Sequence, residues 1–156
     1  LDYMEENTNW ELLDHRNVDN FSQEGANTAM RDLLTKYDDI DIVFNMMDDL
    51  TTGTVQAIEA AGRNDGSIKV YGNMGNPSTF TMLTGDKDEV YGLNFADYYT
   101  QYCMAMGFAL YYASTGVNAA MLGLTATPEY ALSCWPVTPE NAELYSTLSR
   151  WDLAIN

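Results

Sequence analysis

Polar and sulfur-containing side chains follow three short apolar runs of the sequence, at the point where each run ends. An amide or a carboxylate can hydrogen-bond a ligand hydroxyl, and a tyrosine can also stack on an apolar ligand face. This chemistry suits a small neutral or polar molecule that is held without covalent change. The candidate ligand-binding residues are Asn45, Met47, Asp48, Asn73, Met74, Asp97 and Tyr98.

Each candidate also has a purely structural interpretation. Asp48 and Asp97 can cap the helices that follow them. Asn73 can tolerate a tight turn, and Met47 can fill the core beside Met46. The functional interpretation therefore depends on the joint placement of these residues at one edge of the fold.

Hydrophobic periodicity and capping residues predict the elements that position the candidates. Ser22 is a suitable cap for a helix whose apolar stripe begins at Ala26 and Met30, and Gly62 is suited to end the helix after it. Strands are predicted over 10–18, 40–44, 68–72, 90–95 and 132–137. Helices are predicted over 1–7, 23–37, 50–61, 77–84 and 98–114, with a last one starting at 138.

This alternation predicts an α/β fold with a doubly wound, mostly parallel sheet. In an open parallel sheet the ligand site lies beyond the carboxyl ends of the strands. The ends of strands 40–44, 68–72 and 90–95 should therefore share one rim, and the candidate residues should lie on it.

The charge of the chain excludes one class of partner. The 156 residues include 7 Lys and Arg against 23 Asp and Glu, a formal net charge of -16. Phosphate groups are bound by Lys and Arg, so the sequence argues against nucleic acid and anionic membrane surfaces. The length suits one domain, and no apolar run is long enough to span a bilayer.

Nothing in the sequence points to catalysis, a cofactor or a metal. The single histidine, His15, lies on a predicted strand, and no serine-hydrolase, zinc-protease or phosphate-loop motif is present. A calcium loop could begin at Asp86, but Tyr91 occupies the place of its required glycine. Cys103 and Cys134 are far apart; one disulfide remains open, and two free buried thiols are favoured.

Three stretches carry a resemblance to a known family: DLLTKYDDIDIVFNMMDDLTTGTVQAIEAAG, IKVYGNMGNP and VYGLNFADYYTQYCMAMG. Together they resemble the carboxy-terminal lobe of the type I periplasmic binding proteins, the ribose- and galactose-type receptors of ABC importers. The closing PVTPENAEL is also similar to the tail of such receptors. The resemblance covers nearly the whole chain and implies two lobes, joined by hinge strands, with a ligand trapped between them.

The resemblance also implies ligand-binding positions, and this chain departs from the family at two of them. Sugar-binding members carry Asn directly before the Asp of the first turn, where this chain has Met47. In the next turn the family usually carries Asp before Gly, where this chain has Met74. In the turn at the hinge the family often carries Gln, where this chain has Asp97 or Tyr98. The implied ligand is a sugar by default; it is either less hydroxylated on this side or held by polar groups of the other lobe.

The implied domain organisation is a single lobe over 1–156, with 98–156 including the segment that crosses the hinge. In the family's strand order, 2-1-3-4-5, the first strand would lie between 10–14 and 40–44, so this chain is expected to start after it, inside its first helix. Without the other lobe, the apolar side chains of helix 98–114 would partly face water. The isolated chain is therefore expected to form a homodimer or a swapped assembly.

The resemblance implies an exported solute-binding protein, extracytoplasmic in the periplasm or as a cell-surface lipoprotein, with an ABC transporter permease as partner. The alternative is the effector-binding lobe of a lactose-repressor-type transcription regulator. That alternative needs a basic DNA-binding head, so the sequence before Leu1 would discriminate the two.

Overall fold

Helices and strands alternate along the chain. The computed structural model describes residues 9–85, 90–96, 98–118, 120–123 and 134–147. In chain order the elements are α2 (Gln23–Lys36), β1 (Ile42–Phe44), α3 (Asp48–Ala60), β2 (Lys69–Met74), α4 (Pro77–Thr84), β3 (Val90–Phe95), α5 (Tyr98–Thr115), β4 (Trp135–Val137) and α6 (Ala142–Ser146).

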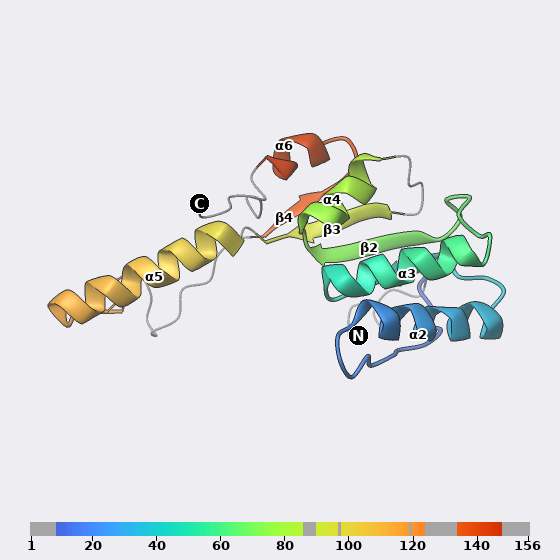
Figure 1. Cartoon of the computed structure of the whole chain (residues 1–156), viewed down its shortest axis with the longest axis horizontal. Coiled ribbons are helices and arrows are strands. Elements are labelled where there is room, and N and C mark those ends of the chain that lie inside the picture. Colours follow the sequence, from blue (N-terminus) through green and yellow to red (C-terminus); the bar gives the residue numbers. More distant parts are fainter. Residues whose placement is uncertain (1–8, 86–89, 97, 119, 124–133, 148–156) are drawn as a thin grey trace.

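The four strands form one sheet in the order β1-β2-β3-β4 (Figure 1). β1 pairs with β2 and β2 with β3 in parallel, whereas β4 runs antiparallel to β3. The predicted α/β fold with a mostly parallel sheet is therefore confirmed. Because β1, β2 and β3 point the same way, the loops after β1 and β2 leave the same edge of the sheet.

Local sequence signals mark the start of α2 and the end of α3. Ser22 caps α2 by accepting a hydrogen bond from the Gly25 backbone N–H at 3.1 Å. Gly62 follows the end of α3 with φ +68°, the left-handed conformation that glycine adopts readily. Between the two helices, Gly53 faces the Gln23 carbonyl so closely that a Cβ would lie 2.1 Å from it.

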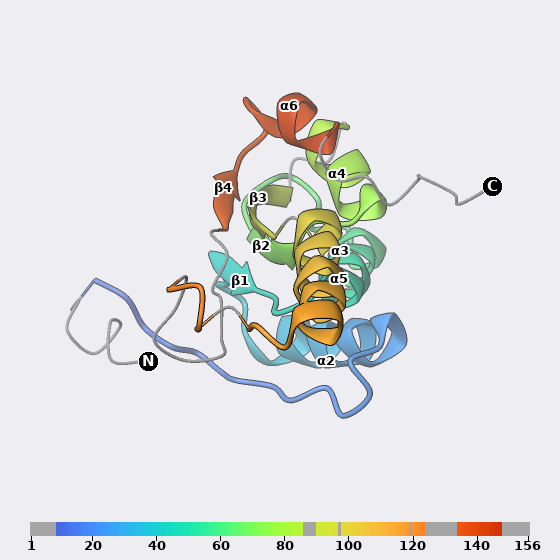
Figure 2. The ribbon, with the colours of Figure 1, turned by 90° about the vertical axis from the view of Figure 1, so that its left-hand side faces the viewer.

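The core lies between the sheet and the helices on one side of it. Figure 2 shows α2, α3 and α4 together on one side of β1, β2 and β3. Alternate residues of the central strand, such as Val70 and Gly72, face these helices, and Val70 is fully buried. The largest fully buried apolar side chains are Phe95, Met30, Ile58, Ile68, Val55, Val70 and Val137.

The predicted strand over 10–18 is wrong, because these residues form neither a strand nor a helix. The segment instead contacts the end of α2. The Tyr37 hydroxyl donates to the Leu13 carbonyl at 2.7 Å, and Lys36 pairs with the Asp14 carboxylate at 3.0 Å. A strand needs a neighbouring strand for its backbone groups, and in the described part of the chain nothing pairs with this one.

The last predicted helix starts later than expected. The sequence predicts a start at 138, but α6 begins at Ala142. Asn141 instead accepts a hydrogen bond from the Thr138 backbone N–H at 2.9 Å, which closes a turn ahead of the helix. The helix predicted over 1–7 lies outside the described residues.

Helix α5 has a different environment from the other long helices. Figure 1 shows it extending away from the sheet. Five of its large apolar side chains are exposed: Tyr102, Met106, Leu110, Tyr111 and Tyr112. The helix contains no acidic or basic residue, so its exposed surface is neutral as well as apolar.

Candidate functional site

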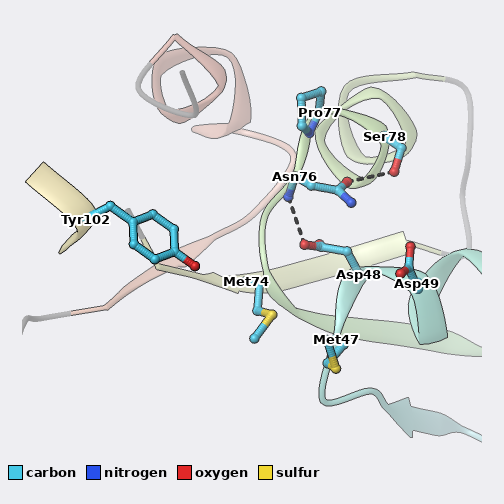
Figure 3. Close-up of a pocket in the computed structure, with 8 residues that line it drawn as sticks. All are labelled: Met47, Asp48, Asp49, Met74, Asn76, Pro77, Ser78 and Tyr102. Carbon is cyan, nitrogen blue, oxygen red and sulfur yellow. Dashed lines mark hydrogen bonds between the residues drawn. The ribbon is translucent and has the colours of Figure 1, made fainter. Parts of the chain in front are cut away.

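A pocket of about 540 Å³ lies where the loops after β1 and β2 meet the first turns of α5 (Figure 3). Met47 precedes α3, and Met74 ends β2, so the two methionines come from adjacent parallel strands. Tyr102 is contributed by α5. The lining residues are Met47, Asp48, Asp49, Met74, Asn76, Pro77, Ser78 and Tyr102.

Asp48 ties the two loops together. It lies in the first turn of α3 and is only 7% exposed. Its Oδ1 accepts hydrogen bonds from the Gly75 N–H at 3.0 Å and the Thr79 hydroxyl at 2.6 Å, and its Oδ2 accepts one from the Asn76 N–H at 3.0 Å. The carboxylate therefore fixes the loop after β2 and the start of α4 against α3.

This network corrects the interpretation of Asp48 as the cap of α3, and Asp49 does not cap the helix either. The N-cap residue is Met47, and no side chain accepts a hydrogen bond there. Both acidic residues still lie in the first turn, where a negative charge interacts favourably with the helix dipole. Asp48 binds a different loop because that loop presents two backbone N–H groups 27 and 28 residues away in sequence.

Burial raises the pKa of the Asp48 carboxyl above its ordinary value. Desolvation is the largest cause, since removal from water disfavours the ionised form. The hydrogen bonds from Thr79, Gly75 and Asn76 act in the opposite direction, and the nearby negative charge of Asp49 adds to the increase.

The backbone is strained where β2 leaves the sheet. Met74 has φ +93°, and Gly75 follows it with φ +87°. A Cβ on Gly75 would lie 2.7 Å from the Phe95 ring, so only glycine fits there. A positive φ on a residue such as Met is costly and is held in place by its surroundings, here the hydrogen bonds from Gly75 and Asn76 to Asp48.

Two asparagine amides form a chain across the same edge of the sheet. Asn94 of β3 donates to the Asn73 carbonyl oxygen at 2.9 Å, and the Asn73 amide donates to the Met46 backbone carbonyl at 3.2 Å. The chain links β3, β2 and the loop after β1. It uses both the donor and the acceptor of the Asn73 side chain within the protein.

Asn45 lies beside this edge but faces α3. Its side-chain oxygen accepts a hydrogen bond from the Thr54 hydroxyl at 3.1 Å. Its amide nitrogen is buried, with no hydrogen-bond partner among the described residues. The side chain is only partly buried overall and does not line the pocket.

The structure brings together three of the predicted site residues: Met47, Asp48 and Met74 line one pocket. Asn45 and Asn73 belong to the same two strand ends without lining it. Asp97 lies outside the described residues, and Tyr98 begins α5 with its side chain outside the description.

Sequence reasoning missed five of the lining residues, and two signals could have found most of them. Tyr102 is one helical turn after Tyr98, so the two share a helix face. Asn76 caps α4 by accepting from the Thr79 N–H at 3.0 Å, ahead of Pro77 at the first helical position. The missed residues are Asp49, Asn76, Pro77, Ser78 and Tyr102.

The two cysteines are free, as the sequence favours, but they are not buried. Both Cys103 and Cys134 are exposed thiols.

Within the described ranges, no three acidic, histidine or cysteine side chains are grouped so that they could hold a metal ion. Nor does any described helix have the length and apolar character needed to cross a membrane.

Matches to known proteins extend over most of the chain. Residues 1–115 match a family model described as "Periplasmic binding protein domain". No curated protein matches the sequence. Among solved structures, the chain is similar to a galactofuranose binding protein with a TM-score of 0.78 and 17% identity, covering 96% of this chain and 48% of that one.

Two further solved structures show the same likeness. One is the periplasmic binding protein of the arabinose ABC transporter from Shewanella sp. ANA-3 bound to L-arabinofuranose (TM-score 0.69, 19% identity, 97% of this chain and 47% of that one). The other is an ABC transporter solute binding protein from Bacillus halodurans C-125 with bound myo-inositol (TM-score 0.66, 23% identity, 82% and 40%). The chain thus spans about half the length of the solved proteins that it matches.

Proposed function

The chain belongs to the periplasmic binding protein domain family, and from that premise we propose that it is one ligand-binding lobe of a solute receptor for an ABC importer. The observation that carries the proposal is the pocket formed by the loops after two adjacent parallel strands and by Tyr102. Ligands of open parallel sheets bind at this kind of edge. The lobe acts by binding and release, and it has no catalytic role.

The proposed ligand is a sugar or a cyclic polyol, bound between this lobe and a companion lobe. Three solved proteins of this fold are a galactofuranose binding protein, one bound to L-arabinofuranose and one with bound myo-inositol, which supports that ligand class. The chain's lobe is the carboxy-terminal one, and residues 98–156 include the segment that crosses the hinge. In the two-lobe protein, the companion lobe covers the exposed apolar side chains of α5.

The proposed setting is extracytoplasmic, in the periplasm or at the cell surface on a lipid anchor, with the permease of an ABC transporter as protein partner. The excess of acidic residues is compatible with this setting and unfavourable for nucleic-acid binding. No cofactor or metal is required for binding and release.

A matched pair of tyrosine variants in the two-lobe protein tests this proposal. Thermal shift with a panel of sugars and cyclic polyols identifies ligands, and calorimetry then measures their affinity. Tyr102→Ala is expected to weaken binding by about tenfold. The loss of one aromatic stacking contact to the ligand costs roughly 1 kcal/mol, which is close to that factor. Tyr112→Ala is the control, since Tyr112 lies on the same helix but does not line the pocket.

The proposal fails if no member of the panel raises the melting temperature. It also fails if Tyr102→Ala leaves the affinity for every bound ligand unchanged.

A further inference from the structure

The polar groups of the pocket are largely engaged with one another. The buried Asp48 carboxylate accepts three hydrogen bonds from within the protein, of about four that it can accept. Its remaining capacity for a ligand hydroxyl is therefore small, although it is the most deeply buried lining residue.

Asn76 and Ser78 are engaged in the same way. The Asn76 side-chain oxygen accepts from the Ser78 hydroxyl at 2.6 Å and from the Thr79 backbone N–H at 3.0 Å. Figure 3 shows the Asn76 and Ser78 side chains meeting at the pocket wall. Among the described residues, the Asn76 amide nitrogen, the Asp49 carboxylate and the Ser78 oxygen lone pairs have no hydrogen-bond partner and can still pair with a ligand.

The rest of the wall on the strand side is sulfur and hydrocarbon. Met47 and Met74 line the pocket from the ends of neighbouring strands, and both are partly buried. In Figure 3 they lie below Asn76, whereas Pro77 and Ser78 lie above it. A thioether is a weak hydrogen-bond acceptor and no donor, so this part of the wall offers a ligand hydroxyl only a weak acceptor and no donor.

We infer that Met47 and Met74 select a ligand with a deoxygenated edge or a small alkyl or thioalkyl substituent facing them, rather than a fully hydroxylated sugar. This inference rests on the proposed function. A ligand hydroxyl buried against two thioethers loses its water partners and gains at most a weak acceptor, which weakens binding by roughly five- to a hundredfold. A methyl or methylthio group at the same place gains apolar contact instead.

The test is calorimetric binding of matched ligand pairs to the two-lobe protein. Each pair differs at one carbon, such as D-ribose with 5-deoxy-D-ribose, D-galactose with 6-deoxy-D-galactose, and myo-inositol with a monodeoxy inositol. The wild-type protein is expected to bind the deoxy member of at least one pair about tenfold more tightly than its parent.

Variants of the two methionines locate the cause of the preference. Met47→Asn and Met74→Asn each supply a donor and an acceptor, and Asn tolerates the positive φ of residue 74. Both are expected to reduce the preference about tenfold or reverse it. Met47→Leu is the matched control, which stays apolar and should keep the preference, with thermal melting confirming that all variants fold.

Three outcomes separate the two proposals. If the parent sugar binds as tightly as its deoxy analogue in every pair, or if Met47→Asn and Met74→Asn both leave the preference unchanged, the inference is overturned while the proposed function stands. If no member of any pair binds, the proposed function fails and the inference fails with it.

Discussion

The Thr79 hydroxyl donates to the Asp48 carboxylate across 2.6 Å and so joins the first turn of α4 to the first turn of α3. Both side chains are buried, and 31 residues separate them in the sequence. The contact holds in place the strained loop that carries Met74 and Asn76 into the pocket. The architecture of the pocket therefore depends on a carboxylate that binds the protein itself.

Removing this carboxylate should destabilise the fold. Asp48→Ala is expected to lower the free energy of unfolding by about 2–4 kcal/mol, because the buried Gly75 N–H and Thr79 hydroxyl lose a charged acceptor. Urea denaturation measures the change. Asp49→Ala is the control, since Asp49 is exposed and should change stability by about 0.5 kcal/mol or less. Equal effects of the two substitutions would contradict the proposed role of Asp48.

The raised pKa of Asp48 has a defined effect on stability. Because the folded-state pKa lies above the unfolded value near 3.8, proton binding favours the folded state. This contribution is fully present below the unfolded value and is lost as the pH rises through the folded-state pKa. The free energy of unfolding of the wild type minus that of Asp48→Asn should therefore fall as the pH rises from about 3 to about 7. A difference that increases over this range would refute the raised pKa.

The close approach of α2 and α3 predicts opposite effects for two glycine substitutions. Gly53→Ala places a Cβ 2.1 Å from the Gln23 carbonyl, so the helices must separate, at a cost of about 2–4 kcal/mol. Gly107→Ala is the matched control, because nothing lies within 4 Å of a Cβ there and alanine favours the helix by about 1 kcal/mol. Thermal melting of both variants checks the prediction, which is wrong if Gly53→Ala is tolerated.

The two thiols should react without denaturant. Cys103 and Cys134 are exposed and unpaired, so a chromogenic thiol reagent added to the folded chain, at a dilution at which it is monomeric, is expected to modify both. The total measured in denaturant serves as the reference. Burial or pairing of either thiol would appear as a lower native count, and Cys103→Ser and Cys134→Ser would identify which one is protected.

The isolated 156-residue chain should form a homodimer through α5. This helix is neutral in a chain of net charge -16, so pairing two copies there meets little local repulsion. Met106 and Leu110 are 62% and 63% exposed on one helix face, and Met106→Glu with Leu110→Glu should convert a dimer to a monomer. Light scattering measures the mass. Leu144→Glu is the control, because Leu144 is 65% exposed on α6, and it should not change the measured mass. A wild-type chain that is monomeric would contradict the prediction.

Most of the fold could be predicted from the sequence because its signals are local. Ser22 and Asn76 accept cap hydrogen bonds from residues three positions ahead, and Gly62 ends α3 through its own backbone freedom. The segment over 10–18 was predicted wrongly for a non-local reason. A strand depends on a partner strand, which an apolar pattern cannot reveal.

The sequence by itself determined the order of helices and strands from α2 onward, the parallel strand ends at one edge, and the presence of Met47, Asp48 and Met74 there. Only the tertiary structure decided what these residues do. It turned Asp48 toward Gly75, Asn76 and Thr79, paired Asn73 with Asn94, and brought Tyr102 of α5 to the pocket. The physical reason is range: capping and periodicity act within one or two turns of the chain, whereas the partner of a buried polar group is set by how distant segments pack.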